Sequence, residues 1–284
     1  MAQVDITAVL QALDLVYNPA TDNDVRRQAS QYLDQVKNNT NAAEHGFVLG
    51  QDQSLSPQVR HFGLSLIEHV ICHADHGLSD EQQSRLRNGV VQLGQHLRRD
   101  DPSFIRNKIA GLWIEMAKRT WALDWYDLDE LLVRMWSQGL LFQGFVLTVL
   151  ENLSEDIFAR DDAAAVLRGR DLNSAMIEVM TSSQDYAGGL KIGSVIHKLR
   201  YGEEGWLVRL AQFIGDSLES ATTTPPVKDV LLKGLATLRS IFGWVMTPAI
   251  VHSQILFTAC SCLSQHDSDI MTVSLSLSFS SEYS

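Results

Sequence analysis

The sequence predicts an all-α fold, built as an array of helix pairs stacked one on the next. Apolar residues recur at three- and four-residue intervals along most of the chain, which is the period of an α-helix. Strict alternation, the pattern of a half-buried strand, is missing until the last residues. The predicted helices come in pairs that repeat about every 40–45 residues, a period typical of helical repeat arrays.

Length and composition agree with this fold class. The 284 residues exceed what one hydrophobic core usually supports. The chain is 45% hydrophobic and 20% charged, a composition typical of folded, soluble proteins. Its 18 glycines and 6 prolines are too few for an all-β protein with frequent turns. The formal charge of −11 argues against non-specific nucleic-acid or anionic-membrane binding and favours a basic partner.

Local signals place the helices along the chain. Asp22 or Asn23 can cap the second helix, and Ser79 with Gln82 has the spacing of a capping box. Asn18-Pro19 breaks the first helix, and prolines mark further helix starts at Pro57, Pro102, Pro225-Pro226 and Pro248. Predicted helices cover residues 3–17, 22–37, 41–50, 56–74, 79–98, 102–119, 122–138, 140–158, 160–183, 189–219 (broken near 202–205), 226–244 and 247–266.

The long predicted helices each carry one apolar stripe. The clearest stripes are Val25, Ala29, Leu33, Val36; Leu86, Val90, Leu93, Leu97; and Ile105, Ile109, Leu112, Met116. One helix pair cannot bury such stripes alone, whereas stacking on the next pair does so. We therefore predict a right-handed α-solenoid of about six HEAT-type helix pairs. A globular helical bundle is the alternative.

The C-terminal segment has another pattern. Residues 267–284 are rich in serine, and their last apolar residues alternate with polar ones. A disordered or non-helical tail is the first interpretation, since an isolated strand would be only marginally stable. A truncated chain with non-native sequence at its end is a further possibility.

The sequence offers little catalytic or metal-binding chemistry. His69, Cys72, His73 and His76 share one helix face, but ligands on a single helix cannot easily surround a tetrahedral ion. We expect no metal site, no cofactor and no enzyme. The adjacent carboxylates Asp161 and Asp162 are interpreted as a helix N-cap, where acids are favoured.

Cysteine use and the terminus indicate the cellular compartment. Three cysteines, two of them only two residues apart, do not form a disulfide framework and indicate a reducing environment. The first residues lack a basic secretory signal, and no stretch is apolar enough to span a membrane.

Tryptophans and carboxylates gather in the middle of the chain. Trp113 lies in an apolar stripe and is expected to pack in the core, while Trp121 and Trp125 occupy a predicted turn. Binding hot spots are the alternative for these rings. Four carboxylates follow at a helix start and form a candidate acidic patch for a basic partner: Asp124, Asp127, Asp129 and Glu130.

Several segments resemble the β-karyopherins. ATDNDVRRQASQYLDQVKNN is similar to the first repeat of their importin-N-terminal domain, and VRHFGLSLIEHVI is similar to the second. KIAGLWIEMAKRTWALDWYDL resembles the third repeat of the exportin-5 group. Weaker similarity continues through LTVLENLSEDI and FGWVMTPAI, so that the resemblance covers roughly residues 3–266.

The resemblance implies a nuclear transport receptor that shuttles between nucleus and cytoplasm. It implies importin-N-terminal, Ran-binding HEAT repeats over residues 1–119, exportin-like repeats over 120–266 and the separate tail. The implied partners are Ran carrying GTP, protein or structured RNA cargo, and nucleoporins; GTP would enter only as Ran's own nucleotide. Receptors of this family have many more repeats, so we expect an amino-terminal piece or a truncated product.

The resemblance also suggests contact residues, because the second helix of each repeat lines the concave side in this family. The candidate Ran-binding residues are Arg60, His61, Ser65, Glu68, Asn107, Glu115, Lys118 and Arg119. A solvated face with ordinary ion pairs is the other interpretation of the same residues. A HEAT-repeat scaffold for a partner other than Ran is the alternative function.

Overall fold

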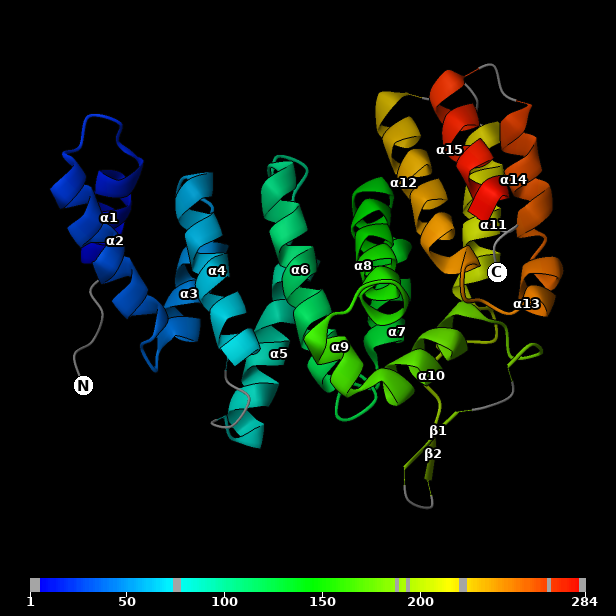
Figure 1. Cartoon of the computed structure of the whole chain (residues 1–284), viewed down its shortest axis with the longest axis horizontal. Helices are drawn as coiled ribbons and strands as arrows, with labels where there is room; N and C mark the ends of the chain where they lie inside the picture. The colour runs from blue at the N-terminus through cyan, green and yellow to red at the C-terminus, as the bar shows by residue number, and fades with distance from the viewer. Residues whose placement is uncertain are drawn as a thin grey trace. The chain divides into compact units, whose positions relative to one another are not determined.

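The computed structural model describes residues 6–73, 78–186, 189–192, 195–219, 224–264 and 267–280. These residues form helices and, as the one sheet among them, a two-stranded hairpin (Figure 1). The predicted all-α class is confirmed. The chain divides into two compact units, Met1–Glu115 and Met116–Ser284, with the division inside a helix and close to the predicted boundary at 119/120. The handedness of the predicted array stays a prediction.

The first unit contains five whole helices and most of a sixth. They are α1 (Ile6–Tyr17), α2 (Asn23–Lys37), α3 (Ala42–Gln51), α4 (Pro57–His73), α5 (Asp80–Gln95) and α6 (Ser103–Thr120), whose last turn belongs to the second unit. Two predicted caps are confirmed. The Asp22 carboxylate accepts the Asp24 N–H at 2.8 Å, and Ser79 with Gln82 forms a capping box.

Apolar stripes of α1, α2, α3 and α4 meet in the core of the first unit. Its buried residues are Val9, Ala12, Leu13, Ala29, Leu33, Val36, Leu49, Phe62 and Leu66. Each fully buried large side chain contributes roughly 1.5–3 kcal/mol relative to an exposed one. Where α3 meets α4, the backbones touch: a Cβ on Gly63 would lie 2.7 Å from the Gly50 nitrogen. Glycine is therefore required there by close approach.

The second unit contains nine further helices and the hairpin within the described residues. They are α7 (Leu128–Trp136), α8 (Leu140–Phe158), α9 (Ala163–Leu167), α10 (Gly169–Met180), β1 (Leu190–Ile192), β2 (Val195–His197), α11 (Trp206–Glu219), α12 (Pro225–Phe242), α13 (Thr247–His252), α14 (Ile255–Leu263) and α15 (Ser268–Ser280). Helix α12 packs on α8, α11 and α15, and α7 packs on α8.

Aromatic rings join these helices. Trp136 meets Trp206 and Phe213 edge-on, with centroids 5.5 and 5.1 Å apart. Phe158 stacks on Trp244 at 4.0 Å. Such pairs contribute about 0.5–1.5 kcal/mol beyond the burial of their area.

The prediction of a helix over 189–219 is wrong in its first half. Antiparallel strands β1 and β2 pair Leu190 with His197 and Lys191 with Ile196. The sequence holds a signal for this hairpin that was missed, since Gly193-Ser194 separates two β-branched stretches. After β2 the chain has no regular structure until α11, and buried carboxylates accept its N–H groups: Glu178 from Leu199 at 2.9 Å and Asp129 from Tyr201 at 2.7 Å.

The expected non-helical tail is also corrected. Residues Ser268–Ser280 form α15, which packs on α12 and α14. Lys228 of α12 binds Asp269 at 2.8 Å, and Ile270 is buried. Tertiary contact thus overrides the weak helix propensity of this serine-rich segment. Residues 281–284 lie outside the described part of the chain.

Three predicted helices are interrupted or shorter. The helix predicted over 160–183 breaks at Arg168, between α9 and α10. The one predicted over 247–266 breaks at Gln254, which has a left-handed φ of 57°. Helix α7 begins at Leu128, because residues 121–127 form a turn. Over the described residues, we find no helix with the length and hydrophobicity needed to cross a membrane.

Candidate functional site

Helices α4 and α6 lie side by side within the first unit. Among the described residues, polar side-chain contacts join α4 to α6 and to the residues just before it, between Arg60 and Asp101, Glu68 and Lys108, and Cys72 and Glu115. The partners are 41, 40 and 43 residues apart. A nearly constant separation means that the two helices run in the same direction, as equivalent helices of successive repeats do. This agrees with the repeat period read from the sequence.

Arg60 is not a surface residue, and its selection as a contact residue is corrected. Only 7% of it is exposed, and its guanidinium binds the Asp101 carboxylate at 2.6 Å. Its Nε donates to the Gly50 carbonyl at 3.3 Å, and Asp101 also accepts the Arg98 N–H at 2.9 Å. The pair therefore fastens the start of α6 to α4, because a buried cation needs a partner.

An open cavity of about 510 Å³ adjoins this ion pair in the first unit. Asp52, Arg60, His96, Arg98 and Asp101 are among the residues that line it. The lining contains two arginines and two aspartates, so that the charge of the cavity favours no single class of ligand.

His61 keeps an accessible position on α4. It is half-buried, and its ring lies 5.8 Å from the ring of Phe104, measured between centroids. Burial lowers the pKa of His61, and the nearby charge of Lys108 lowers it further. His61 is therefore neutral at physiological pH and can offer one donor and one acceptor to a partner.

Four more candidates complete a polar row on α4 and α6. Ser65 is half-buried and donates to the His61 carbonyl at 2.9 Å. Glu68 pairs with Lys108, and Asn107 is exposed. Glu115 is half-buried and accepts from the Cys72 thiol at 3.6 Å. Ran binding by these residues stays a prediction.

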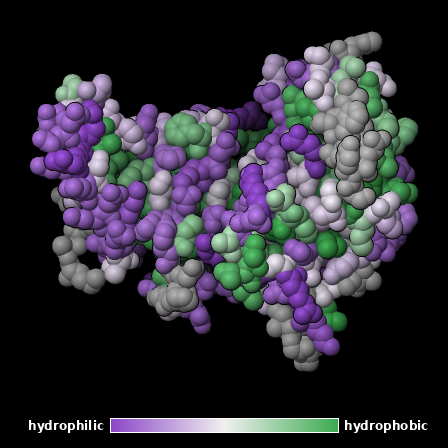
Figure 2. All heavy atoms as spheres, in the orientation of Figure 1, coloured by the Kyte–Doolittle hydropathy of each residue, from purple (hydrophilic) through white to green (hydrophobic). Residues whose placement is uncertain are grey.

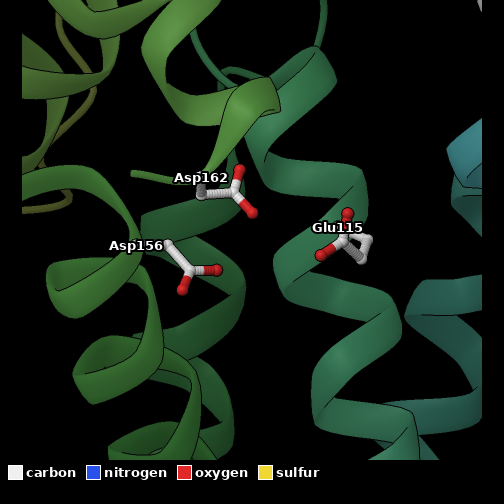
Figure 3. Close-up of side chains that lie close together, drawn as sticks. All are labelled: Glu115, Asp156 and Asp162. Carbon is white, nitrogen blue, oxygen red and sulfur yellow. The ribbon is translucent and has the colours of Figure 1, made fainter. Parts of the chain in front are cut away.

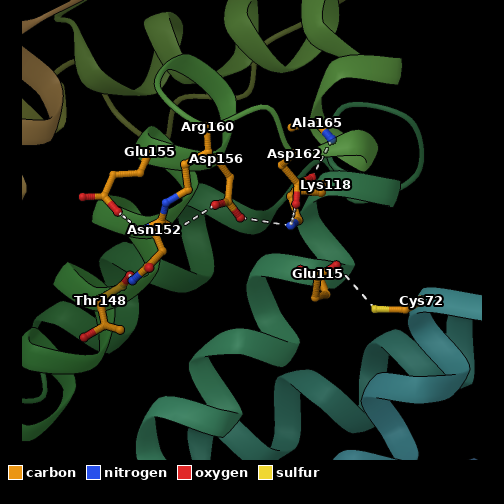
Figure 4. Close-up of polar contacts among 10 residues, drawn as sticks. All are labelled: Cys72, Glu115, Lys118, Thr148, Asn152, Glu155, Asp156, Arg160, Asp162 and Ala165. Carbon is orange, nitrogen blue, oxygen red and sulfur yellow. Dashed lines mark hydrogen bonds and ion pairs between the residues drawn. The ribbon is translucent and has the colours of Figure 1, made fainter.

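Lys118, another candidate, is enclosed in the second unit. It is 1% exposed, and its ammonium group binds Asp156 at 2.9 Å and Asp162 at 2.8 Å. Figure 3 shows both carboxylates directed toward the same space, and Figure 4 shows the bonds to Lys118. Its selection as a surface contact is corrected, since the two acids hold it inside. Neighbouring Arg119 is half-buried.

Asp162 has two roles in this network. Its carboxylate caps α9 by accepting the Ala165 N–H at 2.9 Å, which confirms the predicted cap. Burial alone would raise the pKa of Asp162, but hydrogen bonds from Lys118 and Ala165 outweigh burial and lower it. The carboxylate is therefore ionised and matches the Lys118 charge.

Asp129 does not belong to the predicted acidic patch. It is 2% exposed and accepts the Trp206 indole N–H at 2.6 Å as well as the Tyr201 N–H. Burial raises the pKa of Asp129 to about 6, against the lowering effect of these hydrogen bonds. It holds the segment before α11 in place. Glu130 is half-buried and pairs with Arg134.

The other two acids of the patch are exposed, as predicted. Asp124 and Asp127 stand in the turn before α7, and the Asp127 side chain makes no cap hydrogen bond. Trp121 and Trp125 of the same turn are buried, as is Trp113, whose indole donates to the Val90 carbonyl at 2.9 Å. Packing, rather than a hot spot at the surface, is the role of these three rings.

The described residues of the candidate metal-ligand pattern on α4, His69, Cys72 and His73, contact other groups of the protein. His69 contacts Asn38 at 3.3 Å, and the His73 ring nitrogen lies 2.9 Å from the His69 carbonyl. Cys72 meets Glu115, as noted above. His76, the fourth residue of the sequence pattern, lies outside the described residues.

Comparison with known proteins shows that part of this chain is similar to exportins. The exportin 1-like protein family matches residues 102–183, from the start of α6 to just beyond α10. Exportin-5 of Homo sapiens is 31% identical over 102 residues, which are 35% of this chain and 8% of that protein. The resemblance to exportins is confirmed.

Similarity to two yeast proteins extends over nearly the whole chain. Protein MSN5 of Saccharomyces cerevisiae is 24% identical over 94% of this chain, and an uncharacterized protein of Schizosaccharomyces pombe is 28% identical over 93%. The chain spans 22% of the length of each of these two relatives. The segment with the exportin 1-like match contains Lys118, Asp156 and Asp162, so the buried network belongs to the exportin-like part.

Proposed function

We propose that this chain carries Ran-binding repeats of an exportin-5-like nuclear transport receptor, which takes part in nuclear export of protein or RNA cargo. The exportin 1-like match over residues 102–183, which the similarity to exportin-5 proteins reinforces, is the observation that carries the proposal. The chain would work in a shuttling receptor, in nucleus and cytoplasm, with nucleoporins as further partners. Nucleotide would enter only as GTP held by Ran, and no cofactor of its own is needed.

The surface for Ran would be the polar row of α4 and α6. Arg60 and Lys118 are buried and are left out of the proposed surface. The candidates that remain on the row are His61, Ser65, Glu68, Asn107 and Glu115, and half-buried Arg119 lies near the end of α6. Contacts between α4 and α6 fix their spacing, so a partner meets side chains that are already ordered. Ordering before binding reduces the entropy lost on association.

A pull-down with Ran tests this proposal. The full chain should retain GTP-loaded Ran and release GDP-loaded Ran. A double variant, His61→Ala with Asn107→Ala, should weaken retention by roughly tenfold or more if these side chains lie at the centre of the interface. The variant Arg85→Ala is the control, because Arg85 is an exposed cation on α5 that pairs with Glu81 in its own helix.

Two results would contradict the proposal. Equal retention of both nucleotide states, or no retention, removes the Ran-binding function. Unchanged retention by the double variant, with the same unfolding temperature as the parent, keeps Ran binding but rejects this row as its site.

A further inference from the structure

Three large hydrophobic side chains are exposed around the short helix α9 in the second unit. Leu167 is 86% exposed, Val166 65% and Leu123 50%. Leu167 has the largest exposed fraction of any large hydrophobic side chain among the described residues. Figure 2 shows hydrophobic atoms gathered at the surface over α9. We call these three residues, with Asp124 and Asp161, the α9 surface.

The turn that presents Leu123 is held rigidly. Ala122 has a left-handed φ of 62°, a conformation that costs stability for a residue with a side chain. The N–H groups of the three residues after Ala122 all point to the Thr120 carbonyl, at 3.0–3.1 Å. Arg168, directly after α9, donates to the Trp121 carbonyl at 2.5 Å. This bond fastens the end of α9 to the turn, so both parts of the α9 surface keep their relative position.

Carboxylates stand at both ends of α9. Asp161 is exposed and comes directly before the cap residue of the helix. Asp124 is exposed and belongs to the turn whose Trp121 carbonyl accepts from Arg168, the residue that ends α9. The Arg168 guanidinium itself is directed to backbone carbonyls. Arg160 and Arg170 are the exposed cations nearest to α9 in sequence, and Arg160 is paired with Glu155 and Asp156.

We propose that the α9 surface docks a basic, amphipathic helical segment of a partner protein. Its apolar centre fits leucine-type side chains, and its carboxylates fit lysine or arginine on either side. An anionic membrane would be repelled by the same carboxylates. A second copy of this chain would bring like charges together. The docking surface lies in the second unit and does not depend on the Ran-binding row.

The dimensions of α9 define the spacing that the partner needs. A five-residue helix is about 7.5 Å long. Two cations seven residues apart on a helix are separated by about 10 Å along its axis. The residues three and four places after the first cation lie between them on the same face. Lysines at positions one and eight with leucines at four and five would therefore match the α9 surface.

Fluorescence anisotropy with a designed probe tests the proposal. The probe is a labelled peptide of about 18 residues, built from alanine with this lysine and leucine spacing, and long enough for partial helicity. Its counterpart has glutamate at each lysine position. The full chain should bind the basic probe at least tenfold more tightly than the acidic one, with weaker binding as salt is raised.

Variants identify the surface. Leu167→Ser and the double change Asp124→Asn with Asp161→Asn should each weaken binding by roughly tenfold. Phe257→Ser is the matched control, since Phe257 is 76% exposed on α14, and it should leave binding unchanged. Equal affinity for the two probes, no binding of the basic probe, or loss of binding in Phe257→Ser alone would overturn the proposal. Concentration-dependent dimerisation that Leu167→Ser abolishes would identify a second copy as the occupant instead.

Discussion

Lys118 is a cation enclosed by protein, with Asp156 and Asp162 as its two neutralising neighbours. Charges inside a protein are stable only when they are paired, and removal of one partner leaves the other uncompensated. The network joins the last turn of α6 to α8 and to the cap of α9. One lysine therefore holds three elements of the second unit.

The variant Lys118→Met should lower the free energy of unfolding by roughly 3 kcal/mol, because Asp162 loses its ammonium partner and Asp156 is left with Arg160. Arg85→Met, at an exposed ion pair, should change it by less than about 0.5 kcal/mol. Urea denaturation measures both. Adding Asp156→Asn and Asp162→Asn to Lys118→Met should restore part of the loss. A Lys118→Met protein as stable as the control would contradict this account.

Asp129 makes stability depend on pH in a predictable direction. Its folded-state pKa of about 6 exceeds the ordinary value of 3.8, so the folded protein binds the proton more tightly than the unfolded chain. The associated stability is present below the ordinary pKa and is lost as pH rises through about 6. Deprotonation thus removes on the order of 2 kcal/mol between about pH 4 and about pH 7.

Asp129→Asn isolates this effect, because asparagine does not titrate. The difference in unfolding free energy between parent and variant should shrink as pH rises across that range. The variant should be less stable at low pH, since its amide NH2 cannot accept a hydrogen bond from both Tyr201 and Trp206. A difference that stays constant with pH would refute the assignment.

Residue roles were predictable from sequence where they depend on near neighbours. Caps at Asp22, Ser79 and Asp162 involve contacts within three residues and were predicted. The burial of Arg60 and Lys118 was not, because an exposed and a buried cation look alike on a helical face. What distinguishes them is a carboxylate about 40 residues away, 41 for Arg60 and 38 for Lys118 with Asp156.

At the scale of elements, the approach of α3 to α4 is controlled by glycine. A Cβ on Gly63 would lie 2.6 Å from the Leu49 Cβ and 2.7 Å from a backbone nitrogen. Real contacts are longer, so one helix must move. By contrast, nothing lies within 4 Å of a Cβ on Gly111 in α6.

Gly63→Ala should therefore destabilise the protein, by roughly 1–3 kcal/mol from overpacking. Gly111→Ala, the matched change in another helix interior, should stabilise by about 0.5–1 kcal/mol through helix propensity. Thermal unfolding followed by circular dichroism compares the two. The unfolding temperature should fall in Gly63→Ala and rise in Gly111→Ala. Equal changes in the two variants would show that close packing at Gly63 does not control stability.

The type of each element could be predicted where its apolar stripe is long. The prediction was wrong where contacts with other elements determine whether a segment is helix or strand. Helices α4, α5 and α6 follow their stripes closely. Helix α15 has no such stripe and is held by α12 and α14. The hairpin was missed because a short apolar run does not distinguish strand from helix, although Gly193-Ser194 was a readable sign.

For the whole molecule, the division into two compact units predicts which part of the chain a destabilising substitution affects. Repeat proteins are stabilised mainly by contacts between neighbouring elements. Gly63→Ala should increase amide hydrogen exchange mainly within residues 1–115, and Lys118→Met mainly within 116–284. Peptide-resolved mass spectrometry measures this. Uniform acceleration by either variant would show one cooperative unit instead.

The irregular segment before α11 offers a practical use. Asp129 and Glu178 accept its backbone N–H groups, and Tyr126 stacks on His197 at 4.4 Å where β2 ends. The chain that follows β2 is thus anchored by side chains outside the hairpin. A fluorophore or affinity tag grafted between β1 and β2 should leave the helices intact, which gives transport assays a labelling position outside the unit that contains α4.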